Sequence, residues 1–146
     1  PFNETMWSKW VQRKAAPPIP GAVPFLDRAR SLGGKIAIVT NRSQADCPAT
    51  EENFKAQGIP YDLMLCKPKE GRTDKDARFE RVQKGEAAPG VPALEVLMWV
   101  GDNIQDFPGL KQDIRAKGEE PFASFGKTYF AIPNPMYGSW ERNPRR

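Results

Sequence analysis

Apolar side chains recur at helical spacing in some segments of this chain and form short continuous runs in others. Met6, Trp7, Trp10 and Val11 would share one face of a helix, whereas residues 35–40 (KIAIVT) are typical of a buried parallel strand. The pattern predicts helices over residues 5–15, 21–32, 50–57 and 73–84, strands over 35–40, 62–66, 95–100 and 128–132, and a loop with a helix over 107–117.

Strands that alternate with helices favour a parallel sheet covered on both faces, that is, a three-layer α/β domain with a mostly parallel sheet. Residues 1–146 contain no internal repeat, low-complexity tract or long linker, so we expect a single domain. Thr50 is the expected N-cap of the third helix. Trp7, Trp10 and Phe25 are expected in the core, because aromatic residues at helical spacing are usually buried.

The composition excludes several kinds of chemistry. The chain contains no histidine, which rules out Ser-His-Asp and Cys-His catalysis and histidine zinc sites. Any bound metal should be a hard cation held by oxygen. The 22 Lys and Arg residues against 18 Asp and Glu give a net charge of +4, which suits an anionic substrate without requiring a nucleic acid.

Other signals bear on the location of the protein. No apolar run approaches 18 residues, so we expect no transmembrane segment, and no signal peptide is visible at the first residues. Cys47 and Cys66 fit no metal-binding spacing. They could pair, but separate thiols are the favoured interpretation, and the compartment stays undecided.

Polar residues follow three of the predicted strands. Thr40, Asn41 and Arg42 follow the first strand, GDNIQD (101–106) follows the third, and PNPMYG (133–138) follows the fourth. In parallel sheets, ligands bind beyond the carboxyl ends of the strands. We therefore expect these groups to converge on one edge of the sheet.

Each candidate group has a chemical and a structural interpretation. Asp102 and Asp106 could hold a divalent ion, or could form a turn that caps the next helix. Thr40 and Asn41 could cradle a phosphate, or could stabilise a turn with their side chains. Lys75, near a predicted helix N-terminus, could neutralise phosphoryl charge or could be an ordinary surface lysine.

In order along the chain, these groups resemble the haloacid dehalogenase (HAD) superfamily of aspartate-nucleophile phosphohydrolases. The flanking words resemble its class C (subfamily IIIB) acid phosphatases, which include bacterial lipoprotein 5′-nucleotidases. The resemblance runs from Trp7 to Glu141, and its words are PIPGAV (18–23), VTNR (39–42), KDARF (75–79), GDN (101–103) with Asp106-Phe107, and PNPMYG (133–138) with Trp140-Glu141.

The resemblance implies a HAD-like fold and Mg²⁺-dependent hydrolysis of a small phosphomonoester such as a nucleotide. Carried over residue by residue, it makes Thr40, Asn41 and Lys75 catalytic, Asp102 and Asp106 metal-binding, and Arg42, Asn134 and Tyr137 substrate-binding. Asp102 would ligate the ion and Asp106 would hold a metal-bound water. Tyr137 would stack on a nucleobase. The resemblance also suggests a periplasmic, outer-membrane-anchored or secreted protein, and it leaves a homo-oligomer open.

One part of the family pattern is absent. The nucleophile motif D-x-D-x-T does not occur in the chain, and Asp74-Lys75-Asp76 has the right spacing but opens a helix after Thr40. In the family, the motif and its strand precede the stretch that resembles residues 2–10, so we expect both upstream of Pro1. Without an attacking carboxylate these 146 residues would be inactive, so the alternative function is a non-catalytic phosphate- or nucleotide-binding module.

Overall fold

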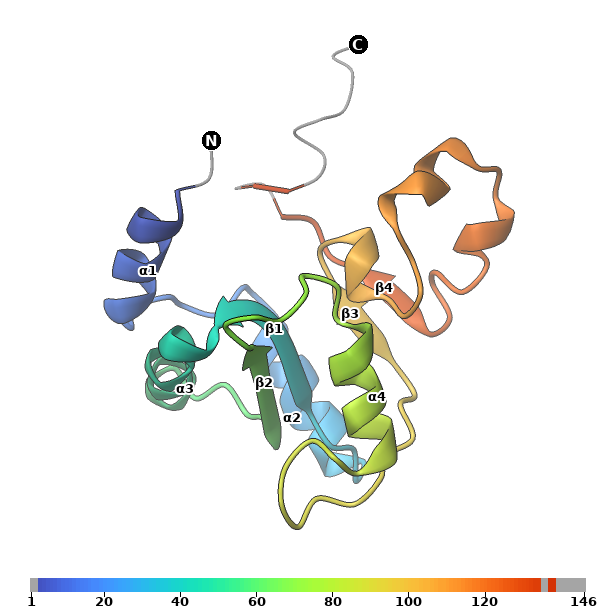
Figure 1. The fold of residues 1–146 in the computed structure, drawn as a ribbon. Coiled ribbons are helices and arrows are strands. Elements are labelled where there is room, and N and C mark those ends of the chain that lie inside the picture. Colours follow the sequence, from blue (N-terminus) through green and yellow to red (C-terminus); the bar gives the residue numbers. More distant parts are fainter. Residues whose placement is uncertain (1–2, 135–136, 139–146) are drawn as a thin grey trace. The chain divides into compact units, whose positions relative to one another are not determined.

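The computed structural model describes residues 3–134 and 137–138 (Figure 1). The chain divides into two compact units, Pro1–Thr73 with Ala87–Gly90 and Asp74–Glu86 with Val91–Arg146. Each unit has its own pair of parallel strands, so the predicted combination of helices and parallel strands is confirmed. Pro135, Met136, Trp140 and Glu141, which belong to the motifs that resemble the family, lie outside the described residues.

The first unit contains the elements from α1 to β2. These are α1 (Glu4–Gln12), α2 (Ala22–Ser31), β1 (Ala37–Ser43), the short 3₁₀ helix η1 (Gln44–Asp46), α3 (Cys47–Ala56) and β2 (Leu63–Lys67). Asn3 caps α1, because its side-chain oxygen accepts the backbone N–H of Met6. All five elements predicted within residues 1–67 are present, with shifted ends.

The ladder between β1 and β2 is interrupted where the polar residues begin. Ala37, Ile38 and Val39 pair in parallel register with Leu63, Met64 and Leu65, and pairing resumes only at Ser43 with Lys67. Three residues of β1, Thr40–Arg42, therefore lie opposite one residue of β2, Cys66. We call Thr40–Arg42 the bulge. Its backbone conformation is not set by a regular ladder.

The core of the first unit is smaller than the sequence pattern predicts. Its buried apolar residues are Val11, Cys47, Ala49, Leu63, Leu65 and Cys66. The prediction that Trp10 and Phe25 belong to the core is wrong, since their exposed fractions are 37% and 45%, and Trp7 is only half-buried. β1 is also not a fully buried strand, because every residue in it is exposed or half-buried. Helical spacing shows that a face is apolar, but packing decides whether another element covers it.

The predicted start of α3 is wrong by three residues. The helix begins at Cys47, with a proline in its first turn, and Thr50 lies inside it with 2% of its surface exposed. The Thr50 hydroxyl donates to the backbone carbonyl of Asp46 at 3.0 Å instead of capping the helix. A proline in the first turn is favourable because its missing N–H has no helical partner there.

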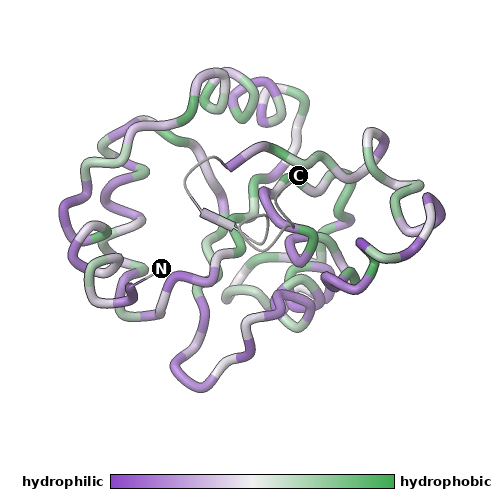
Figure 2. The backbone as a smooth tube through the Cα atoms, turned by 90° about the horizontal axis from the view of Figure 1, so that it is seen from above, coloured by the Kyte–Doolittle hydropathy of each residue, from purple (hydrophilic) through white to green (hydrophobic). Residues whose placement is uncertain are grey.

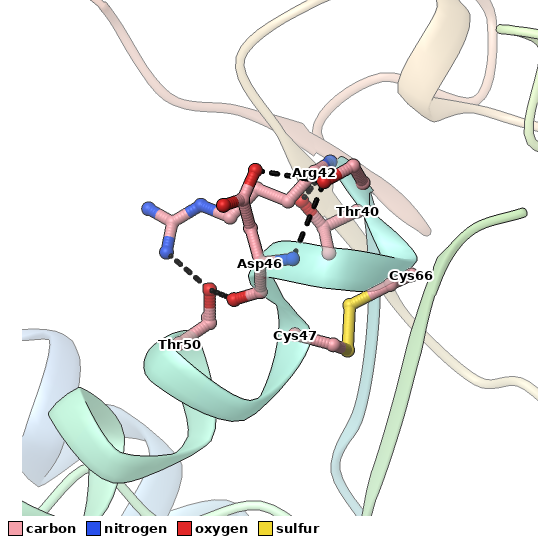
Figure 3. Close-up of a disulfide and its surroundings, with 7 residues drawn as sticks. Thr40, Arg42, Asp46, Cys47, Thr50 and Cys66 are labelled. Atoms are coloured by element: carbon pink, nitrogen blue, oxygen red, sulfur yellow. Dashed lines mark hydrogen bonds between the residues drawn. A yellow bond between two sulfur atoms is a disulfide. The ribbon is translucent and has the colours of Figure 1, made fainter. Parts of the chain in front are cut away.

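The two cysteines form a disulfide in the structure, which corrects the expectation of separate thiols (Figure 3). Cys47 begins α3 and Cys66 lies in β2, with their Cα atoms 6.1 Å apart. Both residues are 5% exposed. The bond therefore links the residue opposite the bulge to the start of the helix that follows it. Sequence spacing could not show this pairing, because it depends on the path of the chain.

The second unit contains α4 (Asp76–Lys84), β3 (Trp99–Gly101), the 3₁₀ helices η2 (Ile104–Asp106), η3 (Gln112–Ala116) and η4 (Glu120–Phe122), and β4 (Tyr129–Ala131). Gly85 ends α4 as its left-handed C-cap, with φ 74°. Phe107, which is 1% exposed, stacks on Tyr129 and meets Phe125 edge to face. Phe79 of α4 packs against Trp99 of β3.

The predicted strand over residues 95–100 is mostly not a strand. Only Trp99–Gly101 pairs, and its partner β4 is equally short, with Trp99 opposite Tyr129 and Gly101 opposite Ala131. Leu97 and Met98, which precede it, are 74% and 46% exposed. An apolar run becomes a strand only over the length for which a partner strand is available. The predicted helix over 107–117 is likewise reduced to the 3₁₀ helix η3.

Hydrophilic and hydrophobic segments follow one another at short intervals along the backbone (Figure 2). In the part of the chain that the structure describes, no helix is both long enough and apolar enough to cross a bilayer.

Candidate functional site

The carboxylate of Asp106 organises the turn at the end of β3. Its Oδ2 accepts the backbone N–H groups of Asp102 and Asn103, each at 3.0 Å. The Asn103 side chain in turn accepts the backbone N–H of Gln105. Asn103 and Asp106 together form a capping box around η2. The sequence left open that Asp106 caps a turn, and the structure shows it in this role.

The second oxygen of Asp106 holds Lys75. The Lys75 Nζ lies 2.8 Å from Asp106 Oδ1, and the two side chains are only 15% and 12% exposed. Lys75 is the N-cap residue of α4, close to the predicted place at a helix start. Asp106 is thus shared between a cation and two backbone donors, which fixes the ammonium beside the end of β3. Lys75 is not an ordinary surface lysine.

Gly101 allows this turn to close. A Cβ atom built on Gly101 would overlap the Cβ of Asp106 and would lie 2.6 Å from its Oδ2. The absence of a side chain at residue 101 therefore lets Asp106 lie directly against the backbone.

Asp102 meets residues that follow β4. Its Oδ2 accepts the side-chain N–H of Asn134 at 2.5 Å, and the Asn134 Oδ1 accepts the backbone N–H of Tyr137 at 3.4 Å. Desolvation raises the pKa of the Asp102 carboxyl above its ordinary value; the hydrogen bond from Asn134 opposes the rise and the neighbouring Asp106 adds to it. The ends of β3 and β4 therefore do bring their polar residues together, as the parallel-sheet rule predicts.

The described residues offer a small set of ligands for a cation. Within residues 3–134 and 137–138, no cluster of three or more His, Cys, Asp or Glu side chains is placed to hold a metal ion. Both oxygens of Asp106 are engaged by Lys75 and the backbone, and Asp102 is the other carboxylate of this turn. A hard cation such as Mg²⁺ commonly takes only one or two protein carboxylates, so the donor chemistry fits one.

Thr40, Asn41 and Arg42 belong to the first unit and form the bulge of β1. The Thr40 Oγ1 accepts the backbone N–H of Arg42 at 3.2 Å, and the Asn41 Nδ2 donates to the backbone carbonyl of Thr73 at 2.7 Å. The side-chain-stabilised turn that the sequence left open is therefore present. A hydroxyl, a carboxamide and backbone N–H groups in one irregular segment are the donor types of an anion cradle.

Arg42 points its guanidinium at groups of the first unit. Nη1 donates to the Thr50 Oγ1 at 2.9 Å (Figure 3). The guanidinium carbon lies 5.7 Å and 5.8 Å from the ring centres of Trp7 and Trp10. These are cation–π distances. The two tryptophans, predicted as core, instead form a surface on which Arg42 rests.

Sequence reasoning missed Asp46, which is 6% exposed. Its Oδ1 accepts from Ser8 Oγ at 2.8 Å and Gln12 Nε2 at 3.1 Å, and its Oδ2 accepts from Ser43 Oγ at 2.7 Å. The Ser-x-x-Asp spacing of Ser43 and Asp46 was a usable signal for a capped turn. The donors from α1 could not have been found, since they lie 38 and 34 residues away in the chain.

The charge on Asp46 is compensated locally. Burial by itself would raise the pKa of the Asp46 carboxyl, but the hydrogen bonds from Ser43, Ser8 and Gln12 and the positive charge of Arg42 outweigh it, so the pKa lies below its ordinary value. Beside it is a hollow of about 570 Å³, lined by Glu4, Thr5, Ser8, Lys9, Gln12, Ser43 and Asp46. The serine and glutamine side chains of this hollow are committed to the carboxylate.

Two solved structures from Bacillus anthracis have the same fold. The class C acid phosphatase from Bacillus anthracis with tungstate bound is 30% identical, with a TM-score of 0.76 over 92% of this chain and 56% of that one. Another structure of the class C acid phosphatase from Bacillus anthracis is 28% identical, with a TM-score of 0.78 over 94% and 57% of the two chains.

Related sequences include two plant proteins. The stem 31 kDa glycoprotein of Glycine max is 27% identical over 143 residues, which cover 93% of this chain and 48% of the relative. The stem 28 kDa glycoprotein of Glycine max is 26% identical over 144 residues, covering 93% and 49%. The chain thus spans about half the length of the curated relatives it matches.

Residues 1–140 match the family described as HAD superfamily, subfamily IIIB (acid phosphatase). The match takes in both units, including the bulge of β1 and the turn after β3. This chain therefore belongs to subfamily IIIB of the HAD superfamily, the acid phosphatase family.

Proposed function

We propose that the protein to which these residues belong is an acid phosphatase that hydrolyses small phosphomonoesters. The observation that carries the proposal is the turn after β3, where Asp106 holds Lys75 at 2.8 Å and binds the backbone of Asp102. A fixed ammonium beside a carboxylate that can take a cation is suited to the charge of a phosphoryl group in transfer. Membership of the acid phosphatase family supports it.

The chain's own residues would bind and orient the phosphoryl group. In this proposal the Thr40 hydroxyl and the Asn41 segment donate to phosphoryl oxygens, and Lys75 neutralises their charge and orients the nucleophile. Asp106 would contribute indirectly, by holding Lys75 and the backbone N–H groups of the turn in place. A related phosphatase has been solved with tungstate, a tetrahedral oxyanion of the same shape as phosphate, which supports an oxyanion as the group bound.

A divalent cation, Mg²⁺ in our proposal, would be held by Asp102. Bound there, it would supply positive charge to polarise the phosphoryl oxygens. Because both Asp106 oxygens are already engaged, Asp106 would not be a direct ligand of the cation and would affect it only by fixing the turn that carries Asp102.

The proposed substrate class is nucleotides and similar small phosphates. Tyr137, 39% exposed, has its backbone fixed by Asn134 and can offer its ring to a base. Arg42 is proposed as a substrate-binding residue as well. Its guanidinium contacts Thr50 and the two tryptophans, so Arg42 would bind substrate through the backbone of the bulge.

The nucleophile is proposed to lie outside the 146 residues, in a D-x-D-x-T segment on a strand of its own. Two observations support this: the motif does not occur in the sequence, and each sheet of the described residues has only two strands. The aspartate would displace the alcohol of the phosphomonoester and form an aspartyl-phosphate, from which water would release orthophosphate and restore the carboxylate. An added strand would complete the single three-layer HAD-like domain, with a mostly parallel sheet, that we propose for the whole protein.

The alternative is a non-catalytic phosphate- or nucleotide-binding module. It is favoured by the same absence of D-x-D-x-T from the sequence, because the proposed phosphate-binding side chains are present without an attacking carboxylate. Hydrolysis by the full-length protein would exclude it.

The disulfide bears on the compartment. Structural disulfides persist in oxidising surroundings such as the periplasm and the cell exterior. The buried Cys47–Cys66 bond therefore supports the proposal that the protein is periplasmic, anchored at the outer membrane or secreted.

Replacement of Asp102 tests the proposed activity. In the full-length protein with Mg²⁺, Asp102→Asn is expected to lower the release of phosphate from p-nitrophenyl phosphate by about 100-fold or more, because it removes the proposed cation ligand. Asp113→Asn is the matched control: Asp113 lies in the same unit, is exposed and pairs with Lys117 at 2.8 Å. Unchanged turnover in Asp102→Asn would contradict the assignment.

A further inference from the structure

Side-chain contacts hold the bulge, whose three residues face one residue of β2. The Thr40 hydroxyl accepts the Arg42 N–H within the bulge, and Arg42 then reaches Thr50. Ser43, which directly follows the bulge, returns to the ladder opposite Lys67. The position of Thr40 and Asn41 therefore depends on what holds Arg42 and Ser43.

Ser43 is hydrogen-bonded to Asp46 directly, and Arg42 is connected to it through Thr50 (Figure 3). The Ser43 hydroxyl donates to the Asp46 carboxylate at 2.7 Å, and the Asp46 backbone N–H donates back to the same hydroxyl at 3.2 Å. The Thr50 hydroxyl, which accepts from Arg42, donates to the Asp46 carbonyl oxygen at 3.0 Å. Asp46 thus holds the chain directly after the bulge and, through Thr50, the last residue of the bulge.

The same carboxylate also anchors α1. Ser8 and Gln12 of α1 donate to Oδ1, while Oδ2 serves Ser43. Three donors to one buried carboxylate hold it in place, since each lost partner would leave buried charge uncompensated. α1 and the turn after β1 are therefore both bound to the Asp46 carboxylate.

We propose that Asp46 is a positioning residue for phosphate binding, which acts through Ser43 and through Thr50 and Arg42 to hold Thr40 and Asn41 in their binding arrangement. The proposal rests on the proposed function, since it takes the bulge as the segment that binds phosphoryl oxygens. A shift of about 1 Å in such a segment is enough to lower binding and turnover substantially.

The test is Asp46→Asn in the full-length protein, which keeps the shape of the side chain and removes its charge. The dissociation constant of orthophosphate, measured by calorimetry, and the KM for p-nitrophenyl phosphate are both expected to rise about tenfold. Ser8→Ala removes one donor from α1 and is expected to act in the same direction with a smaller effect. It keeps the test open if Asp46→Asn does not fold.

Asn53→Ala is the matched structural control. Asn53 lies in the same helix, is 4% exposed, and makes two side-chain hydrogen bonds to the backbone of Ala16, each at 3.0 Å, without touching Asp46. Its loss should lower the melting temperature while leaving phosphate affinity and KM unchanged.

Wild-type KM and phosphate affinity in folded Asp46→Asn or Ser8→Ala, or equal losses in Asn53→Ala, would overturn the positioning role. Absence of hydrolysis by the wild-type protein would instead overturn the proposed enzyme. In that case, weaker orthophosphate binding by Asp46→Asn alone would still support positioning.

Discussion

In each unit, one carboxylate binds several groups of a turn at once. Asp106 joins a lysine to two backbone N–H groups, and Asp46 joins two hydroxyls and an amide. In each case the carboxylate uses both of its oxygens, which makes the surrounding turn rigid. Asp102, which follows Gly101 directly, is positioned by the first of these turns and not by a long strand.

Gly101→Ala tests how closely the turn after β3 is packed. The added methyl group would overlap Asp106, so the free energy of unfolding is expected to fall by about 1–3 kcal/mol. Phosphatase activity should fall too, because displacement of Asp106 releases Lys75. Gly118→Ala is the control, since its Cβ would meet nothing within 4 Å. Equal stability of the two variants in urea unfolding would contradict the proposed packing.

At the scale of elements, α3 and β2 hold the bulge from two sides. α3 begins at Cys47, directly after Asp46, and the disulfide ties that first turn to Cys66, the residue opposite the bulge. A buried covalent link and a buried hydrogen-bonded carboxylate thus occupy neighbouring positions in the sequence. The apolar core of this unit is small, which makes such links important for stability.

Replacement of both cysteines by serine is expected to lower the free energy of unfolding by about 3 kcal/mol, because the bond closes a loop between residues 19 apart in the sequence. Urea unfolding with and without dithiothreitol measures this. The reductant should destabilise the wild-type protein by a similar amount and leave the Ser variant unchanged. A wild-type protein indifferent to reductant throughout the unfolding transition would show that the bond contributes nothing.

At the scale of the whole molecule, the proposed phosphate-binding residues are divided between the units. Thr40 and Asn41 belong to the first unit, whereas Lys75 and Asp102 belong to the second. The proposed function requires both groups to act on one phosphoryl group.

A double-mutant cycle tests this requirement. Thr40→Ala and Asp102→Asn are each expected to weaken orthophosphate binding in the presence of Mg²⁺, and their combined effect should differ from the sum by about 1 kcal/mol or more, because residues that share a ligand do not act independently. Thr40→Ala combined with Asp113→Asn should be additive. Additivity in both pairs would argue against a shared phosphate.

Local patterns identified most elements and much of the candidate site. The end of α4 at Gly85 and the turn at Gly101 depend on residues near in sequence, whereas the predicted N-cap Thr50 lies inside α3. The predictions failed where a distant partner decides the outcome. The run over 95–100 pairs only over β3, and Trp10 and Phe25 are not covered by other elements.

By itself, then, the sequence determined that helices alternate with parallel strands and that histidine chemistry is excluded. It also determined the family, because the family's motifs are short stretches of neighbouring residues. The tertiary structure decided that Lys75 is held by Asp106, that Cys47 pairs with Cys66, and that Asp46 joins α1 to the turn after β1. The physical reason is that spacing encodes bonds within a turn of helix or a strand, whereas contacts between distant residues form only when the path of the chain brings them together.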